Sequence, residues 1–509
     1  MIAQVNSTAL LGIDGYIVDV ETDISNGLPA FDIVGLPDAA VKESKERIRA
    51  AIKNTGLTMP SKRITVNLAP ADVKKEGAHF DLPIAVGILA ASEQLSVPED
   101  GDVFLGELSL NGDLRRINGV LPMVISAYQR GVKSVYLPKE NAREAAVIEG
   151  LKVYGADSLK EIILHFTGQN KIKPHTVDIG SMLLSNEQSR YDFKDVKGQF
   201  FVKRALEIAA AGGHNLLMIG PPGSGKTMIA QRIPSILPDM SFEESLEVTK
   251  VHSIAGLVSE KAPIISERPF RHPHHTISSV GLSGGGSNPR PGEISLSHNG
   301  VLFLDELPEF RRDALEAMRQ PLEDGEVTIT RSGGTVTYPC SVMLVASMNP
   351  CPCGYYGDPT RECSCSQTQI MKYMSKISGP LLDRIDLHVE VPAVKYEELE
   401  TKEQGEPSAD IKRRVNNARQ LQLERYKCRG VYSNSQLTPE LMEKHCALDN
   451  EANELLKQAY ETLGLSARAH NRILKVARTI ADLAGEKDIK VEHIAEAIQY
   501  RALDKKFFN

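Results

Sequence analysis

The sequence predicts a multidomain α/β protein with a mixed α+β N-terminal region, a central α/β region and a helical C-terminal region. Strand-like segments alternate with helical patterns between residues 192 and 392, which predicts a parallel sheet covered by helices on both faces. After residue 393, apolar residues recur at helical spacing and no convincing strand follows.

Length and charge limit the class of protein. The chain has 509 residues, enough for about three domains. Its 59 basic and 66 acidic residues give a net charge of −7, which argues against coating DNA through bulk charge but leaves a local basic channel open. Hydrophobic residues make up 41%, which excludes wholesale disorder. Aromatic residues make up only 5% and Trp is absent, which argues against a base-stacking platform.

Neither a targeting signal nor a membrane span is visible in the sequence. The first basic residue is Lys42, so a secretory n-region is missing. The longest uncharged apolar stretch, 82–91, is too short to cross a bilayer. Seven cysteines in this context do not indicate a disulfide framework. We therefore expect a cytoplasmic protein with reduced thiols and no membrane partner.

Secondary-structure patterns suggest four segments: a domain over 1–168, a linker over 169–191, a domain over 192–392 and a helical domain over 393–509. In the first domain, a turn at 111–113 between two apolar runs predicts a hairpin. The expected elements there are strands at 16–20, 31–34, 63–68, 103–110, 114–117 and 134–137, and helices at 39–54 and 84–95.

Helical spacing defines the last domain. Its first helix has an apolar stripe of four residues: Ile411, Val415, Ala418 and Leu421. A second helix starts at Ser466 and ends before Gly485, and a third covers 491–500.

A phosphate-binding loop is the strongest motif in the chain. It consists of Gly220, Pro221, Pro222, Gly223, Ser224, Gly225, Lys226 and Thr227. An apolar strand at 215–219 precedes it and a helix at 228–237 is expected to follow. Its backbone N–H groups and the helix N-terminus suit ATP phosphates. Lys226 would contact the β- and γ-phosphates, and the Thr227 hydroxyl would bind Mg²⁺.

Two further strands end in residues suited to the same site. The apolar strand 301–304 ends in Asp305 and Glu306, so Asp305 would hold Mg²⁺ and Glu306 would polarise the attacking water. Strand 342–346 leads to Asn349, which would lie beside the γ-phosphate because parallel sheets bind ligands at the carboxyl ends of their strands.

Four cysteines form two Cys-x-Cys pairs within 15 residues: Cys351, Cys353, Cys363 and Cys365. Four thiolates suit the tetrahedral preference of Zn²⁺, although the spacing is not the commoner Cys-x-x-Cys. A structural zinc site is our interpretation. The alternatives are unrelated reduced cysteines in a surface insertion, or a redox pair.

The three strand-end motifs together resemble an AAA+ ATPase, with Walker A at 220–227, Walker B at Asp305 and Glu306, and sensor 1 at Asn349. Four further segments resemble the magnesium-chelatase-like family called YifB or ComM: 268–278, 292–300, 379–386 and 466–468. The resemblance covers nearly the whole chain. It implies a ring-forming, usually hexameric motor, and ComM-type members are linked to DNA branch migration and helicase action during transformation.

The resemblance also assigns two arginines. Arg384 matches the arginine finger that reaches a neighbour's γ-phosphate, and Arg468 matches sensor 2 in the helical lid. Fixed positive charge is useful where phosphoryl transfer develops negative charge. The alternatives are a surface salt bridge from Arg384 to Asp383 or Asp386, and an ordinary first-turn arginine at position 468.

The first domain resembles the proteolytic domain of Lon, at 75–83 and 106–113. Lon proteases use a Ser–Lys pair. This sequence has His79, Phe80 and Asp81 where the Ser segment is expected, and no Lys in the segment 118–123. We infer a non-proteolytic Lon-like domain that serves as an assembly platform or a DNA contact.

Two basic elements have open interpretations. A cluster of Arg268, Arg271, His272, His274 and His275 is either a pore-facing DNA contact or a packed loop, and a histidine metal site is the weaker alternative. A basic helix face is a solvated surface rather than a DNA contact in our interpretation; it comprises Lys412, Arg413, Arg414, Arg419 and Arg425.

The leading hypothesis is therefore an ATP-hydrolysing ring motor that acts on single-stranded or branched DNA, with ATP and Mg²⁺ as its nucleotide and metal. The ATP site follows from the residues, and DNA follows mainly from the resemblance. The alternatives are a protein-remodelling ATPase subunit of the chelatase type and a non-catalytic assembly scaffold.

Overall fold

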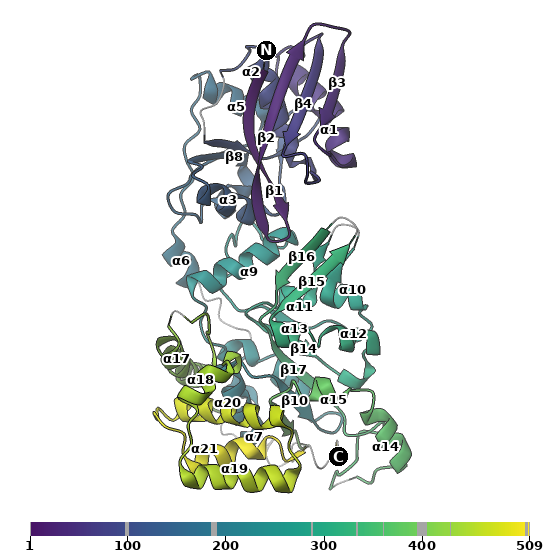
Figure 1. Cartoon of the computed structure of the whole chain (residues 1–509), viewed down its shortest axis with the longest axis vertical. Coiled ribbons are helices and arrows are strands. Elements are labelled where there is room, and N and C mark those ends of the chain that lie inside the picture. The colour runs from purple at the N-terminus through teal and green to yellow at the C-terminus, as the bar shows by residue number, and fades with distance from the viewer. Residues whose placement is uncertain are drawn as a thin grey trace. The chain divides into compact units, whose positions relative to one another are not determined.

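The structure is a computed structural model that describes residues 2–96, 101–184, 191–286, 289–331, 334–359, 361–393, 405–427, 429–503 and 507. It has two compact units. Unit 1 comprises Met1–Ser185 together with Phe242–Ser266, and unit 2 comprises Asn186–Ser241 together with Glu267–Asn509. The predicted mixture of α+β, parallel α/β and helical parts is confirmed (Figure 1).

Unit 1 is built on a mixed sheet in the order β3-β4-β2-β1-β5-β8-β9. The long strands alternate buried and exposed residues, because one face of the sheet covers the core. The strands are β1 (Ile2–Leu11), β2 (Asp14–Ser25), β3 (Ala30–Val34), β4 (Arg63–Ala69), β5 (Asp102–Phe104), β8 (Ser134–Pro138) and β9 (Lys152–Ala156). The helices are α1 (Ala39–Asn54), α2 (Asp81–Ala91), α3 (Val120–Gln129), α4 (Lys139–Ala145), α5 (Leu159–Phe166) and α6 (Ile179–Leu184).

Two expected elements of unit 1 differ from the structure. The helix expected over 84–95 is α2, which begins at Asp81 and ends at Ala91 because Glu93 adopts a left-handed φ of 61°. The strand expected over 103–110 is divided at Gly106, whose N–H donates to the carbonyl of His79 at 2.9 Å. Its second part, β6 (Glu107–Leu108), forms the predicted hairpin with β7 (Leu114–Arg115).

A segment from the middle of the sequence, 242–266, completes unit 1. Its helix α9 (Phe242–Ile254) packs on α3. The N–H of Gly119 donates to the carbonyl of Ser253 at 2.9 Å, and the Ser253 hydroxyl donates to the buried carboxylate of Glu144. The chain between the phosphate-binding loop and Asp305 therefore leaves unit 2 and returns to it.

Unit 2 contains a parallel sheet in the order β11-β14-β17-β10-β18, of which β14, β17 and β10 are labelled in Figure 1. The strands are β11 (Phe270–Arg271), β14 (Val301–Leu304), β17 (Met343–Met348), β10 (Leu216–Ile219) and β18 (Leu387–Glu390). The three predicted strands before the phosphate-binding loop, Asp305 and Asn349 are thus neighbours. Because all described pairs are parallel, their carboxyl ends meet at one edge of the sheet.

Smaller elements connect these strands. The helices are α7 (Phe200–Gly212), α8 (Lys226–Ala230), α10 (Ser279–Ser283), α11 (Glu293–Leu296), α12 (Arg312–Ala317), α13 (Pro321–Asp324), α14 (Gln367–Met374) and α15 (Gly379–Leu382). Two small hairpins are β12 (Gly284–Gly285) with β13 (Arg290–Pro291), and β15 (Glu326–Arg331) with β16 (Gly334–Pro339).

The helical part follows the predicted pattern closely. It comprises α17 (Ser408–Arg425), α18 (Pro439–His445), α19 (Asn450–Leu463), α20 (Ala467–Leu483) and α21 (Val491–Gln499). The Ser466 hydroxyl caps α20 by accepting from the N–H of Ala469 at 3.2 Å. On α17, Gln422 rather than Leu421 is buried, since its amide donates to the carbonyl of Ala211 at 3.1 Å. Among the described helices, none is long and apolar enough to cross a membrane.

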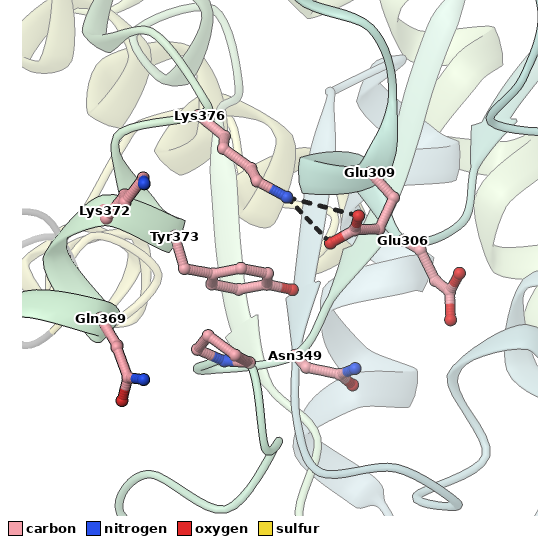
Figure 2. A pocket seen from close by; sticks show the side chains of 8 residues that line it. Glu306, Glu309, Asn349, Gln369, Lys372, Tyr373 and Lys376 are labelled. Atoms are coloured by element: carbon pink, nitrogen blue, oxygen red, sulfur yellow. Dashed lines mark hydrogen bonds and ion pairs between the residues drawn. The ribbon is translucent and has the colours of Figure 1, made fainter. Parts of the chain in front are cut away.

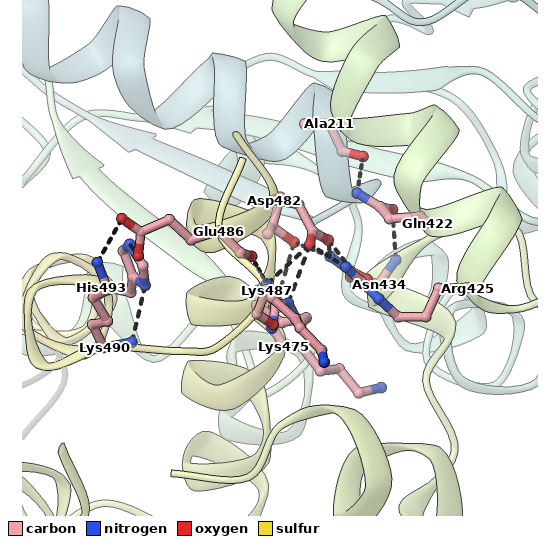
Figure 3. A network of polar contacts seen from close by, with 12 residues as sticks. Ala211, Gln422, Arg425, Asn434, Lys475, Asp482, Glu486, Lys487, Lys490 and His493 are labelled. Carbon is pink, nitrogen blue, oxygen red and sulfur yellow. Dashed lines mark hydrogen bonds and ion pairs between the residues drawn. The ribbon is translucent and has the colours of Figure 1, made fainter. Parts of the chain in front are cut away.

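A buried carboxylate ties the helices of this part together. Asp482 on α20 accepts from Arg425 on α17 at 2.6 and 2.9 Å, and from Arg478 at 3.2 Å (Figure 3). The amide of Asn434 donates to the same carboxylate at 2.8 Å. A buried charge is tolerated only when it is paired and hydrogen-bonded, so these contacts fix α17 against α20.

We predict that Glu144→Ala destabilises unit 1 by about 1–3 kcal/mol, because it removes the acceptor for three buried donors. The carboxylate accepts from the N–H of Leu121 at 3.2 Å, from the Asn141 amide at 3.4 Å and from Ser253. The free energy of unfolding in urea is the measurement. Glu140→Ala, at an exposed position of the same helix, is the matched control. Equal unfolding midpoints for the two variants would contradict the prediction.

Candidate active site

The phosphate-binding loop joins β10 to α8. Gly223 and Gly225 have φ values of 78° and 89°, which side chains rarely tolerate, so the loop can turn its N–H groups inward. Lys226 begins α8, and its ammonium donates to the carbonyls of Gly220 at 2.8 Å and Pro221 at 2.9 Å.

The helix after the loop is shorter than expected. Instead of a helix over 228–237, α8 ends at Ala230 and a 3₁₀ turn, Ile233–Ile236, follows. Pro234 lies in this turn, and proline lacks the N–H that would continue the α-helix.

The Lys226 ammonium is largely buried. Burial lowers the pKa of Lys226 to about 8, although the nearby charges of Asp305 and Glu306 act in the opposite direction. The ammonium also donates to the Asn349 side-chain oxygen at 3.3 Å. A desolvated cation with these neighbours is well suited to receive a polyphosphate.

Asp305 links the ends of three strands. The Thr227 hydroxyl donates to Oδ2 of Asp305 at 2.6 Å, and the Ser347 hydroxyl donates to Oδ1. The structure therefore brings together Lys226, Thr227, Asp305 and Asn349. Sequence analysis missed Ser347; its signal is a hydroxyl at the end of an otherwise apolar buried strand.

Glu306 directly follows Asp305, and its side chain is exposed. Its φ of 56° is unusual for a residue with a side chain, and such strain of about 1–3 kcal/mol gathers at functional sites. Nδ1 of His275 lies 3.8 Å from the Glu306 carboxylate, and both side chains are partly exposed. His275 belongs to the basic cluster identified in the sequence.

A pocket of about 450 Å³ opens beside Glu306 and Asn349 (Figure 2). Lys372 and Tyr373 line it from α14, and Lys376 pairs with Glu309 across it at 3.1 Å. The buried Tyr373 hydroxyl bonds to the backbone of Asn349, so α14 supports the residue expected beside the γ-phosphate.

A second cavity, of about 220 Å³, is lined by Ser224 and Gly225 of the loop. Its apolar lining includes Val196, Met228 and Ile229, with Lys197 and Gln199 nearby. A flat aromatic base next to a phosphate-binding loop would fit such a lining. Sequence analysis missed Val196, Lys197 and Gln199 because they follow the linker without a distinctive motif.

The two arginines assigned by resemblance lie elsewhere in unit 2. Arg384 follows α15 and pairs with Glu323, not with Asp383 or Asp386 as the alternative interpretation expects. Arg468 is exposed in the first turn of α20. Within the described residues, neither arginine contacts the phosphate-binding loop.

The other basic residues are mostly used within the fold. Arg268 donates to the carbonyls of Pro238 and Asn299 at 2.7 Å, and Arg271 forms a two-bond pair with Glu293. These contacts match the packed-loop interpretation for both arginines. On α17, Arg414 pairs with Glu207 and Glu406, and Lys412 pairs with Asp239. Lys412 and Arg414 therefore form ion pairs with acidic residues, whereas the sequence analysis expected a solvated surface.

The four clustered cysteines converge. The Sγ atom of Cys351 lies 3.3 Å from that of Cys353 and 3.7 Å from that of Cys363, and all four Sγ atoms lie within 4.8 Å of one another. The N–H of Cys353 donates to Cys365 Sγ at 3.4 Å. Sulfurs at 2.3 Å from one Zn²⁺ would be roughly 3.8 Å apart, so the set fits a tetrahedral metal.

The Lon-like segment has a structural arrangement of its own. Asp81 is buried and pairs with Arg47 at 2.7 Å, and burial raises the pKa of Asp81 to about 6. Burial lowers the pKa of His79 to about 4. Asp81 anchors α2 to α1 through its pair with Arg47. It also anchors α2 to the hairpin, because its carboxylate accepts from the N–H of Leu108.

Comparison with known proteins agrees with this architecture. The family model "Magnesium chelatase, subunit ChlI" matches residues 192–399, "Subunit ChlI of Mg-chelatase" matches 20–141, and "Magnesium chelatase, subunit ChlI C-terminal" matches 405–501. The chain is thus a protein of the magnesium-chelatase-like AAA+ class.

The relatives narrow this class. The chain is 45% identical to the competence protein ComM of Haemophilus influenzae, over 99% of this chain and 98% of that protein. It is 44% identical to the protein YifB of Escherichia coli, over 98% and 97% respectively. It belongs to the YifB/ComM family. A Lon protease of Acinetobacter baumannii is 26% identical over 34% of this chain and 23% of that protein.

We predict that the affinity for Mg·ATP weakens above about pH 8, by up to tenfold per pH unit. Burial lowers the pKa of Lys226 to about 8, and only the protonated amine attracts the triphosphate, so affinity is full below this pH and declines above it. Binding of a fluorescent ATP analogue between about pH 7 and pH 9.5 is the measurement. Lys226→Arg keeps its charge and should abolish the dependence; a flat wild-type profile would refute the assignment.

Proposed function

We propose that this protein is an ATP-hydrolysing, ring-forming motor that acts on DNA, at branched or single-stranded regions. The observation that carries the hydrolytic part is the convergence of Lys226, Thr227, Asp305 and Asn349 at one sheet edge. Family membership supports the same reaction. Lys226 would bind the β- and γ-phosphates, with Gly223, Ser224 and Gly225 supplying N–H groups.

The residues present fit a magnesium ion with the nucleotide. The Thr227 hydroxyl and the Asp305 carboxylate already face one another at 2.6 Å, and hydroxyl and carboxylate oxygens are the ligands that Mg²⁺ prefers. Mg²⁺ would neutralise charge on the β- and γ-phosphates. Glu306 would orient the attacking water and accept its proton. Asn349 would lie beside the γ-phosphate and help to position it.

DNA as the substrate, a hexameric ring and a cytoplasmic location are the finer parts of the proposal. The Haemophilus relative is named a competence protein, which supports a task on DNA.

The four-segment division at 168, 191 and 392 remains our proposal for the functional domains, with the Lon-like domain as a platform without protease activity. A protein-remodelling ATPase subunit is the second candidate, supported by the match to chelatase subunit ChlI.

We also propose that Cys351, Cys353, Cys363 and Cys365 hold a structural Zn²⁺ ion. Their mutual approach supports this, as does the packing of the loop that carries them. A Cβ atom added to Gly354 would meet Cδ of Pro222 at 2.4 Å, so the cysteine loop lies directly against the phosphate-binding loop. Metal binding would thus stabilise one wall of the nucleotide site.

ATP turnover by wild-type protein and by Glu306→Gln, each with no DNA and with single-stranded, duplex and branched DNA, tests the function. We expect DNA to stimulate the wild type, and Glu306→Gln to bind ATP but turn over at least about 100-fold more slowly. Glu309→Gln, which changes another carboxylate of the same pocket, is the control. Undiminished turnover in Glu306→Gln would overturn its role, and turnover indifferent to every DNA would favour the protein-remodelling candidate.

Metal analysis of the purified protein tests the zinc site. We expect one zinc per chain, and its loss in Cys363→Ser together with a lower unfolding temperature and weaker ATP binding. Cys340→Ser, a buried cysteine outside the cluster, should keep the metal. A metal-free wild-type sample that is folded and fully active would end this proposal.

A further inference from the structure

Four cysteines lie on the segment that joins β17 to α14, next to the nucleotide site. These residues form the cysteine cluster: Cys351, Cys353, Cys363 and Cys365. The cluster begins two residues beyond Asn349, whose side-chain oxygen accepts from the Lys226 ammonium at 3.3 Å. A change in how the cluster is held would therefore reach Asn349 through the chain itself.

Two further contacts tie this segment to the nucleotide site. The buried Tyr373 hydroxyl on α14 bonds to the backbone of Asn349, so the two ends of the segment meet. Between the cysteine pairs, a Cβ atom added to Gly354 would meet Cδ of Pro222 at 2.4 Å. The middle of the segment is thus packed on the phosphate-binding loop, and its ends are joined at Asn349.

The sulfur atoms of the cluster are close enough to react with one another. Sγ of Cys353 lies 3.5 Å from Sγ of Cys363. A disulfide bond is about 2.05 Å long, so these two atoms need to approach by roughly 1.5 Å, which small rotations of the side chains supply. Cys351 is buried, so it is the less accessible partner for Cys363, although their sulfurs are 3.7 Å apart.

Accessibility separates the cluster from the other described cysteines. Cys353, Cys363 and Cys365 are partly exposed, whereas Cys340 and Cys446 are only 1% and 4% exposed. Burial raises the pKa of Cys340 to about 12 and that of Cys446 to about 11. Because the thiolate is the reactive form, these two buried thiols are poor targets for an oxidant that can reach the cluster.

The turn between the two cysteine pairs is held by contacts of its own. The Arg361 guanidinium lies 4.1 Å from the centroid of the Tyr355 ring and donates to its hydroxyl at 2.9 Å. The N–H of Arg361 donates to the Asp358 carboxylate at 3.1 Å. None of these contacts uses a sulfur atom, so they would keep the two pairs together while the sulfurs change partners.

Oxidation by a peroxide would take two ligands from the metal. The first thiolate attacks the peroxide, the O–O bond breaks, hydroxide leaves and a sulfenic acid forms. The second thiolate attacks that sulfur, an S–S bond forms and a second hydroxide leaves. The two sulfurs lose the two electrons that the peroxide gains. Two remaining thiolates do not satisfy the tetrahedral preference of Zn²⁺, so the ion is released with its charge unchanged.

We propose that the cysteine cluster is an oxidation site that switches off ATP hydrolysis: a peroxide joins Cys353 to Cys363, zinc is released, and Asn349 loses its support. This inference rests on the proposed zinc site and the proposed ATP hydrolysis, and it adds their regulation. A dithiol reductant reverses the step by thiol–disulfide exchange, in which the reductant is itself oxidised to a disulfide, and Zn²⁺ then binds again.

Hydrogen peroxide treatment of the full-length, zinc-loaded protein tests the switch. We expect zinc to be released, Cys353 to be joined to Cys363 in a peptide map made without reduction, and ATP turnover to fall at least about fivefold. Dithiothreitol with Zn²⁺ should restore both metal and turnover. Dithiothreitol does not reduce methionine sulfoxide, so a loss of turnover that it fails to reverse would overturn the inference.

The outcomes of this experiment distinguish the inference from the proposals beneath it. Zinc that stays bound in peroxide, or turnover that is unchanged after zinc release, would overturn the inference and leave the proposed function standing. A reduced protein without zinc would overturn the zinc site and the inference together. A reduced protein that hydrolyses no ATP would overturn the proposed hydrolysis and, with it, the inference.

Cys363→His separates metal binding from oxidation. A Cys₃His set is a common structural zinc site, but an imidazole cannot form a disulfide. Each protein is compared with its own untreated turnover. Wild type and Cys340→Ser should lose most of theirs in peroxide, whereas Cys363→His should keep most of its own. Equal inactivation of all three would overturn the inference, and if Cys363→His binds no zinc, the wild-type peptide map decides whether Cys353 and Cys363 are the reacting pair.

Nucleotide binding should in turn strengthen zinc binding. If zinc release weakens the nucleotide site, thermodynamic linkage requires that bound nucleotide opposes zinc release by the same factor. We expect a non-hydrolysable ATP analogue with Mg²⁺ to raise the zinc affinity of the reduced protein several-fold, measured by competition with a zinc chelator. The same zinc affinity with and without the analogue would show that the cluster is not coupled to the nucleotide site, and would overturn the inference.

Discussion

The nucleotide site depends on the register of three parallel strands. Met218 of β10 pairs with Ser347 of β17, and Leu304 of β14 pairs with Ala346, so the three strands end at the same level. Only then does the Thr227 hydroxyl reach Asp305 at 2.6 Å while the Lys226 ammonium reaches Asn349. A slip of one residue would turn the side chains at these strand ends to the opposite face. Because the strands are apolar and buried, such a slip would be costly. The register therefore keeps the contacts of Thr227 with Asp305 and of Lys226 with Asn349 in place.

Features with a local cause could be predicted from the sequence. The phosphate-binding loop is contiguous, so its glycines, Lys226 and Thr227 are visible without a fold. The start of a helix at Ser466 and its end before Gly485 depend on residues within that helix, and α20 begins directly after Ser466 and ends at Leu483. The predicted strand ends at Asp305 and Asn349 also required only the rule that parallel strands bind ligands at their carboxyl ends.

Features that depend on distant residues could not be predicted in this way. Gln422 is buried because the carbonyl of Ala211, far away in sequence, accepts its amide proton. Segment 242–266 joins unit 1 because Glu144 and Gly119 offer partners to Ser253. A polar residue in a helical stripe, or a helix between two nucleotide motifs, carries no local sign of such partners.

The distribution of positive charge within unit 2 has a simple electrostatic reason. Burial already lowers the pKa of Lys226 to about 8, so further cations beside it would neutralise the amine at physiological pH. Arg384 pairs with Glu323 instead, and in the described part of the chain it contacts no residue of the phosphate-binding loop, so its charge does not add to this cost. Once a triphosphate is bound, its own charge outweighs the repulsion, and additional arginines become favourable.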